Sequence, residues 1–94
     1  MKVIYNPVFI QKLKKLDVRI RKSFRERIVI FQLNPSDPIL DNHPLEQELS
    51  GYQNIDITAD YRAVFEELQE GEERIYYFFL IGTHKELYKL TETQ

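Results

Sequence analysis

Two histidines are the first candidates for chemistry in this sequence. His43 lies in a proline-containing segment and His84 follows a long apolar run, so neither falls within an apolar stripe. Histidine titrates nearest to physiological pH among the side chains, which suits proton transfer at a reacting oxygen. The two could divide the work of a general acid and a general base, although their presence alone does not distinguish catalysis from chance.

The segment from Gly82 to Tyr88 has a sharper pattern. Gly82 permits a tight turn, and in a helix after that turn His84 and Tyr88 would share one face because four positions separate them. A tyrosine one turn from a histidine can stack on a nucleobase while the imidazole reaches the adjacent sugar or phosphate. Lys85 is a further candidate for RNA binding. The alternative is that Tyr88 packs on a sheet and His84 caps the end of a strand.

A second group, Asp60-Tyr61-Arg62, lies at a predicted turn and combines a carboxylate, an aromatic ring and a guanidinium. The guanidinium can bind a phosphate through two hydrogen bonds, and Tyr61 is a candidate for base stacking. Ordinary turn chemistry is the alternative. The sequence has no cysteine, which excludes disulfides, thiolate catalysis and cysteine zinc sites, and we expect neither a metal nor another cofactor.

The elements that would position these residues follow from the pattern of apolar residues. A short strand is predicted over residues 2–5. Asn6 then acts as N-cap and Pro7 as first residue of a helix, and Asp17 caps a second helix that Asn34-Pro35 ends. The stripes that face the core comprise Phe9, Leu13 and Leu16 in the first helix and Ile20, Phe24, Ile28 and Phe31 in the second.

The second half of the sequence predicts a β-meander. Residues 35–51 read as an irregular loop, and such long loops are often functional. Strands are predicted over 53–57, 61–68 and 74–81, with turns at 58–60 and 70–71, and a helical turn over 83–90. The order β-α-α-β-β-β predicts an α+β fold, with the N-terminal strand and a helical hairpin packed on one face of a twisted antiparallel sheet.

Length and composition limit the organisation to one globular domain over residues 1–94. The hydrophobic fraction is 43% and the charged fraction 30%, and no apolar run is long enough to span a membrane. No secretory signal is visible, so we expect a cytoplasmic protein. The net charge of -2 conceals an asymmetry: residues 1–34 carry nine Lys/Arg against two Asp/Glu, and residues 35–94 carry four against thirteen. The basic half suits phosphates or an acidic partner, or simply forms solvated helix faces.

Taken in order, several motifs resemble toxins of the RelE/ParE superfamily, nearest its YafQ branch. The resemblance covers almost the whole chain. The motifs that carry it, after the helical hairpin, are Asn42-His43-Pro44-Leu45, Leu49-Ser50-Gly51-Tyr52, Asp60-Tyr61-Arg62 and Ile81-Gly82-Thr83-His84-Lys85-Glu86-Leu87-Tyr88. The fold that the resemblance implies agrees with the one predicted from the pattern.

The resemblance implies a toxin of a bacterial type II toxin-antitoxin pair that cleaves messenger RNA on the ribosome without a metal. The positions of His43, Asp60, His84 and Tyr88 match functional positions of the YafQ pattern, with His84 the best candidate for proton transfer. Arg62 matches the RelE branch, in which the arginine of a Tyr-Arg pair stabilises charge on the scissile phosphate. A separately encoded antitoxin, the ribosome and messenger RNA are the implied partners, and no membrane is implied.

The sequence also departs from the family pattern. Asp56 stands where the YafQ pattern has a histidine, and the lysines that RelE uses in that strand are absent, so either His43 or Asp60 is left as the general base. The net charge is negative although toxins of this family are usually basic, so ribosome binding would depend on the basic helices. A non-enzymatic inhibitor of DNA gyrase, as in the ParE branch, and an inert relative that binds proteins are the alternative functions.

Overall fold

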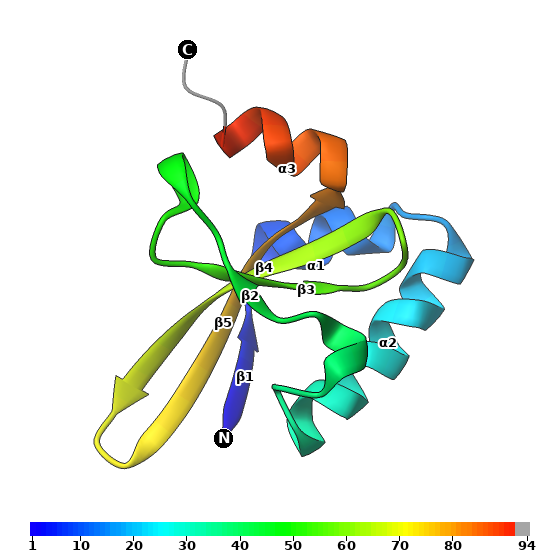
Figure 1. Cartoon of the computed structure of the whole chain (residues 1–94). Helices are drawn as coiled ribbons and strands as arrows, with labels where there is room; N and C mark the ends of the chain where they lie inside the picture. Colours follow the sequence, from blue (N-terminus) through cyan, green and yellow to red (C-terminus); the bar gives the residue numbers. More distant parts are fainter. Residues whose placement is uncertain (92–94) are drawn as a thin grey trace.

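The chain begins with strand β1 (Lys2–Tyr5), helix α1 (Pro7–Lys14) and helix α2 (Val18–Leu33). The computed structural model describes residues 1–91. Next come the 3-10 helix η1 (Pro38–Leu40), the short strand β2 (His43–Pro44) and the 3-10 helix η2 (Gln47–Leu49). Strands β3 (Gln53–Asp56), β4 (Tyr61–Glu70) and β5 (Glu73–Thr83) follow, and then helix α3 (His84–Thr91) (Figure 1). This order confirms the predicted α+β fold.

The five strands form one sheet in the order β1-β5-β4-β3-β2. Strands β2 to β5 pair antiparallel, as predicted, whereas β1 lies parallel to β5, with Lys2 opposite Ile75 and Tyr5 opposite Phe78. The sheet is therefore mixed instead of wholly antiparallel. No hairpin connects β1 to its neighbour, because the two helices follow it, so local turn chemistry does not determine its direction.

The two N-terminal helices start where the sequence predicts. The side chain of Asn6 accepts a hydrogen bond from the amide of Val8 at 2.7 Å, and that of Asp17 accepts one from the amide of Arg19 at 2.8 Å. Both residues thus satisfy an amide that has no partner within the helix. The hydrogen bond also lowers the pKa of the Asp17 carboxyl.

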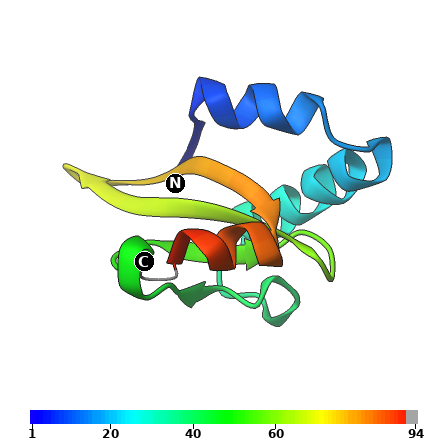
Figure 2. The same cartoon turned by 90° about the horizontal axis from the view of Figure 1, so that it is seen from above.

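An aromatic core lies between these helices and one face of the sheet. Figure 2 shows α1 on one side of the sheet and α3 on the other. The ring of Phe31 is fully buried, and its centroid lies 5.0 to 5.4 Å from those of Phe65, Tyr76 and Phe78. The predicted stripes face this core: Phe9, Phe24, Ile28 and Phe31 are buried, and Leu13, Leu16 and Ile20 pack against them.

Two local expectations need correction. Residues 35–51 contain η1, β2 and η2, so the expected irregular loop adds a fifth strand to the sheet, with His43 opposite Asn54. Strand β5 continues through Gly82 to Thr83, so Gly82 does not make a turn. A Cβ atom at Gly82 would lie 3.1 Å from Glu86 Oε1 and 3.3 Å from Lys12 Nζ, so a larger residue would displace these two side chains slightly. Among the described residues, none of the helices has the length and apolar character needed to cross a membrane.

Candidate active site

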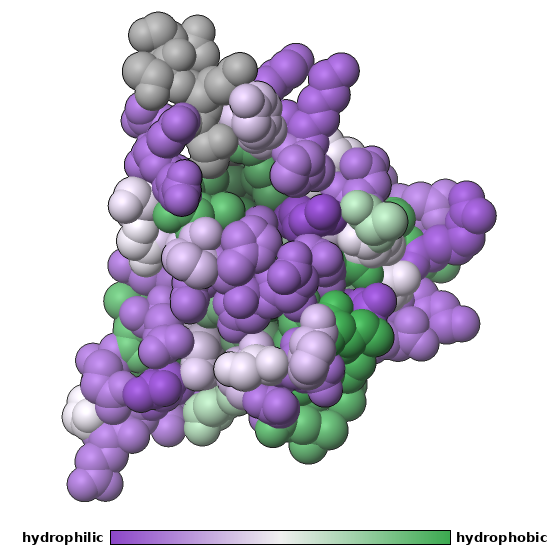
Figure 3. All heavy atoms as spheres, viewed as in Figure 1, coloured by the Kyte–Doolittle hydropathy of each residue, from purple (hydrophilic) through white to green (hydrophobic). Residues whose placement is uncertain are grey.

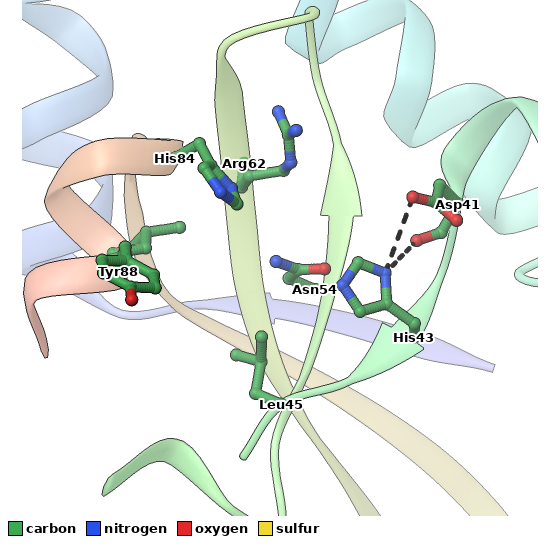
Figure 4. Close-up of a pocket in the computed structure, with 8 residues that line it drawn as sticks. Asp41, His43, Leu45, Asn54, Arg62, His84 and Tyr88 are labelled. Carbon is green, nitrogen blue, oxygen red and sulfur yellow. Dashed lines mark hydrogen bonds and ion pairs between the residues drawn. The ribbon is translucent and has the colours of Figure 1, made fainter. Parts of the chain in front are cut away.

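A cleft of about 320 Å³ opens on the face of the sheet opposite the aromatic core that α1 and α2 cover. Its walls come from the η1–β2 segment, strands β3 and β4, and the start of α3, as the close-up in Figure 4 shows. The lining residues are Asp41, His43, Leu45, Asn54, Arg62, His84, Leu87 and Tyr88. Segments far apart in the sequence therefore meet here.

The alternation of β3 determines which side chains face the cleft. Ile55 and the following Ile57 are fully buried in the aromatic core, so Asn54 and Asp56 point to the other face. Strand β4 pairs with β3 so that Arg62 lies opposite Asp56. Residues directly opposite in an antiparallel pair share a face, and this places the guanidinium on the cleft side.

His43 is held by Asp41. Its Nδ1 lies 2.6 Å from the backbone carbonyl oxygen of Asp41 and 3.7 Å from the carboxylate of the same residue (Figure 4). A carbonyl oxygen accepts hydrogen bonds and cannot donate, so Nδ1 carries the proton and a neutral ring has its lone pair on Nε2. Asp41 adopts a left-handed backbone conformation with φ of 47°, which is uncommon for a residue with a side chain. The geometry leaves Nε2 as a proton acceptor.

His84 is the first residue of α3, and two features fix its position: a backbone hydrogen bond to the β3–β4 turn and a capping box at the start of the helix. Its amide donates to the carbonyl of Asp60 at 2.7 Å. Thr83 and Glu86 form a reciprocal capping box: the Thr83 amide donates to Glu86 Oε1 at 2.8 Å, and the Glu86 amide donates to Thr83 Oγ1 at 3.1 Å. The bond from the Thr83 amide, helped by the charge of Lys12, lowers the pKa of the Glu86 carboxyl. The imidazole itself remains exposed.

Tyr88 follows His84 by one helical turn, as predicted. The two ring centroids are 6.5 Å apart with planes inclined by 30°, and Tyr88 is 57% exposed. Leu87, between them in the sequence, is buried against the sheet and anchors α3 there. The helix thus presents a histidine and an aromatic ring along one edge of the cleft.

Arg62 holds the β3–β4 turn as well as facing the cleft. Its Nε lies 2.9 Å from the Asp56 carboxylate, and its Nη1 donates to the carbonyls of Thr58 and Ala59 at 3.2 and 3.1 Å. Burial raises the pKa of the Asp56 carboxyl, and the charge of Arg62 opposes that increase. The guanidinium is therefore fixed in position by four residues of the turn and the strands, because Nη1 also contacts the carbonyl of Tyr61 at 3.4 Å.

Asn54 and Asp41 line the cleft but were missing from the sequence prediction. Asn54 is 4% exposed, and its Oδ1 makes no hydrogen bond within residues 1–91. A buried polar group without a partner costs about 1–3 kcal/mol. The strand alternation, which puts Ile55 and Ile57 in the core, would have placed Asn54 on the polar face. Asp41 precedes His43 by two positions, and this spacing is the sequence feature that could have marked it as a candidate.

The structure brings four of the seven predicted site residues together: His43, Arg62, His84 and Tyr88 all line the cleft. The other three are not among its lining residues. Asp60 contributes its backbone carbonyl to the start of α3, Tyr61 packs against the aromatic core, and Lys85 is exposed on α3. Within residues 1–91 no group of three or more His, Cys, Asp or Glu side chains has an arrangement that could hold a metal ion.

Neither a family model nor a curated protein matches the sequence. Solved structures do match the fold. A YoeB/ParE toxin from Agrobacterium tumefaciens superposes with a TM-score of 0.71 at 21% identity, over 89% of this chain and 99% of that one. The RelB-RelE antitoxin-toxin complex from Methanococcus jannaschii gives a TM-score of 0.66 at 22% identity, over 95% of this chain and 99% of that one. The chain has the RelE/ParE toxin fold.

YafQ from E. coli is also similar, with a TM-score of 0.59 at 18% identity over 93% of this chain and 97% of that one. These values do not favour the YafQ branch over the others. The nearest-branch assignment made from the motifs therefore remains a prediction. Two kinds of toxin among the matched structures, RelE and YafQ, were crystallised with their antitoxins, RelB and DinJ.

Proposed function

We propose that this protein is the toxin of a type II toxin-antitoxin system and an endoribonuclease that cleaves messenger RNA on the ribosome. One observation supports this most: a single cleft joins two histidines from different elements, and the first has Nδ1 bonded to a carbonyl so that Nε2 is a proton acceptor. The RelE/ParE toxin fold supports the assignment to the same class of protein.

In this proposal His43 is the general base and His84 the general acid. Nε2 of His43 takes the proton of a ribose 2′-OH, and the 2′-oxygen attacks the adjacent phosphorus. The new bond joins the 2′-oxygen to phosphorus, while the bond from phosphorus to the 5′-oxygen breaks. Protonated His84 gives its proton to that 5′-oxygen. The products are a 2′,3′-cyclic phosphate and a free 5′-hydroxyl. Asp60, the other candidate base, is not among the residues that line the cleft.

Arg62 and Tyr88 would bind the substrate around the reacting atoms. The guanidinium is fixed by Asp56 and the turn carbonyls, so it presents positive charge to the phosphate without further reorganisation. The exposed ring of Tyr88 offers a stacking surface for the neighbouring base. The basic residues of α1 and α2 would meet ribosomal RNA despite the net charge of -2.

Cleavage of a defined messenger in a reconstituted translation reaction tests this proposal. The wild type should cut in the presence of ribosomes and leave cyclic phosphate ends. His84→Ala should lower the rate at least about 100-fold, the lower range for lost acid-base catalysis. Lys89→Ala, an exposed change on the same helix, is the matched control. Intact RNA in every lane, together with arrested DNA replication in cells that express the protein, would favour the gyrase inhibitor instead.

We also propose an acidic antitoxin that covers the basic helix pair. The outer surface of α1 and α2 combines lysines and arginines with exposed apolar side chains: Val8 at 67%, Val18 at 59%, Val29 at 57% and Leu33 at 83%. Figure 3 shows apolar surface over the end of α2 and η1, where Leu33 and Ile39 are exposed. Exposed apolar surface beside positive charge suits an amphipathic, acidic segment of a partner.

Co-elution with a candidate antitoxin, a separately encoded acidic protein, measures this interaction. The pair should co-elute at low salt, and Leu33→Asp should weaken the complex. Leu68→Asp, which changes another exposed leucine near the β4–β5 hairpin tip, should leave it intact. Separate elution of the wild-type proteins, or equal effects of the two changes, would contradict the proposal.

A further inference from the structure

Asn54 is the buried polar residue of the cleft. It is 4% exposed, and its Oδ1 has no hydrogen-bond partner within residues 1–91. On strand β4 it lies opposite the fully buried Val64. An apolar side chain of the same size would satisfy the packing at this position. Packing alone therefore does not require the carboxamide oxygen, which has no hydrogen-bond partner within residues 1–91.

The strand register places Asn54 directly beside the proposed base. His43 and Asn54 are opposite partners in the β2–β3 pair, so their side chains share the cleft face. Figure 4 shows the Asn54 carboxamide between the ring of His43 and the side chains of His84 and Arg62. Its oxygen is directed toward His43 and its nitrogen toward the other two. The amide N–H groups thus point into the middle of the cleft.

We propose that Asn54 binds the ribose 2′-hydroxyl of a nucleotide in this cleft and so selects RNA over DNA. The inference rests on the proposed nuclease function. The 2′-hydroxyl supplies a proton that two acceptors can share: Oδ1 of Asn54, the buried oxygen without a partner within residues 1–91, and Nε2 of His43, toward which that oxygen is directed. A deoxyribose lacks this hydroxyl and leaves Asn54 without a partner. The phosphate is an acceptor for Arg62, so the two side chains read different parts of the nucleotide.

Nucleoside 3′-monophosphates are suitable probes because they contain no 5′-leaving group and cannot be cleaved. Binding of uridine 3′-monophosphate and of its 2′-deoxy counterpart would be measured by calorimetry, with the imidazole NMR signals of His43 and His84 locating the ligand. The wild type should bind the ribonucleotide about threefold to tenfold more tightly, the effect of one neutral hydrogen bond. Asn54→Leu should bind both nucleotides with the affinity that the wild type has for the deoxy form.

Gln53→Leu is the matched control. It removes a carboxamide from the same strand, one position away and therefore on the opposite face, and should keep the wild-type preference. The melting temperature gives an independent readout, because removal of an unsatisfied buried amide should leave it unchanged or raise it. Asn54→Ala serves as a second variant if the leucine does not fit.

The outcomes separate this inference from the proposed function. Equal affinity of the wild type for the two nucleotides, or a ribose preference that survives in both Asn54 variants, would overturn the role of Asn54. If messenger cleavage depends on His84 in that case, the nuclease proposal still stands. If neither nucleotide perturbs the two histidine signals and no messenger is cleaved, the proposed function and the inference fail together.

Discussion

The two faces of the sheet are built from the same strands but differ in almost every physical property. On the helix-covered face, aromatic and aliphatic side chains such as Phe31, Phe65 and Phe78 are fully buried and contact one another. On the cleft face, the ion pair of Asp56 and Arg62, the bonded His43 and the unsatisfied Asn54 lie around open space. The first face provides stability, and the second retains unsatisfied polar groups that a ligand can bind.

This division predicts that core substitutions on the helix face change stability most. Phe31→Ala should lower the free energy of unfolding by about 3–5 kcal/mol, because it removes a fully buried ring and leaves a cavity. Urea unfolding measures this loss. Val29→Ala, two positions away on α2 and 57% exposed, should change stability by less than about 0.5 kcal/mol. Similar losses in the two variants would mean that the helix face is not the source of stability.

A smaller, pH-dependent loss of stability is expected from a substitution on the cleft face. Arg62→Met leaves the Asp56 carboxylate without its cation. It should lower the free energy of unfolding by about 1–3 kcal/mol at neutral pH. Burial raises the pKa of Asp56 and Arg62 opposes this, so without the arginine the carboxyl protonates at a higher pH. Once neutral it needs no cation, and the deficit should shrink as the pH falls. Urea unfolding at several pH values measures the deficit.

Two further variants test that explanation. Asp56→Asn combined with Arg62→Met should lose the pH dependence of the deficit. Arg74→Met breaks an exposed pair in which Nε lies 3.6 Å from Glu67, and should have little effect. A deficit in Arg62→Met that stays constant or grows on acidification would show that the turn bonds of Arg62, and not its charge, account for the loss.

The capping box connects stability to the site. Thr83→Ala removes the N-cap hydroxyl of α3 and should cost about 1 kcal/mol in the free energy of unfolding. It should also slow messenger cleavage, since His84 is the first residue of the helix that the cap begins. Thr83→Ser keeps the hydroxyl and should restore both properties. Loss of stability without any change in cleavage would indicate that the position of His84 does not depend on the cap.

The smallest effect is expected for Glu86→Gln. A glutamine can still accept the Thr83 amide, so stability near neutral pH should change little. The pKa of Glu86 is lowered in the folded state, so its charge contributes stability above the ordinary glutamate pKa, and this contribution is lost as the pH falls through the folded value. Melting temperatures of the two proteins should converge on acidification. Melting temperatures that diverge at low pH would contradict a stabilising contribution from the Glu86 charge.

Local signals in the sequence predicted most of the helix-covered face. The caps Asn6 and Asp17 and the apolar stripes determine α1 and α2 within a few residues, and the structure confirms both. The direction of β1 was not predictable in this way, since it depends on a parallel pairing with β5 across more than seventy positions of sequence. Strand β2, two residues long, was too short for any periodic signal.

The site residues that belong to a local sequence motif were predictable, whereas those that meet only through strand pairing were not. His84 and Tyr88 share a helical face by their spacing, and the structure places them so. Tyr61 and Arg62 are adjacent, and the alternation of β4 sends the tyrosine to the core and the arginine to the cleft. Strand alternation places Asn54 on the polar face, but its position beside His43 follows only from the β2–β3 pairing.

The assignment of His43 as base and His84 as acid is tested most directly with a messenger in which sulfur replaces the 5′-bridging oxygen at the cleavage site. A thiolate leaves without a proton, so this substrate does not need a general acid. His84→Ala should cleave it at nearly the wild-type rate, while His43→Ala should remain at least about 100-fold slower. Failure of the sulfur substrate to rescue His84→Ala, or equal rescue of both variants, would contradict the division of roles across the cleft.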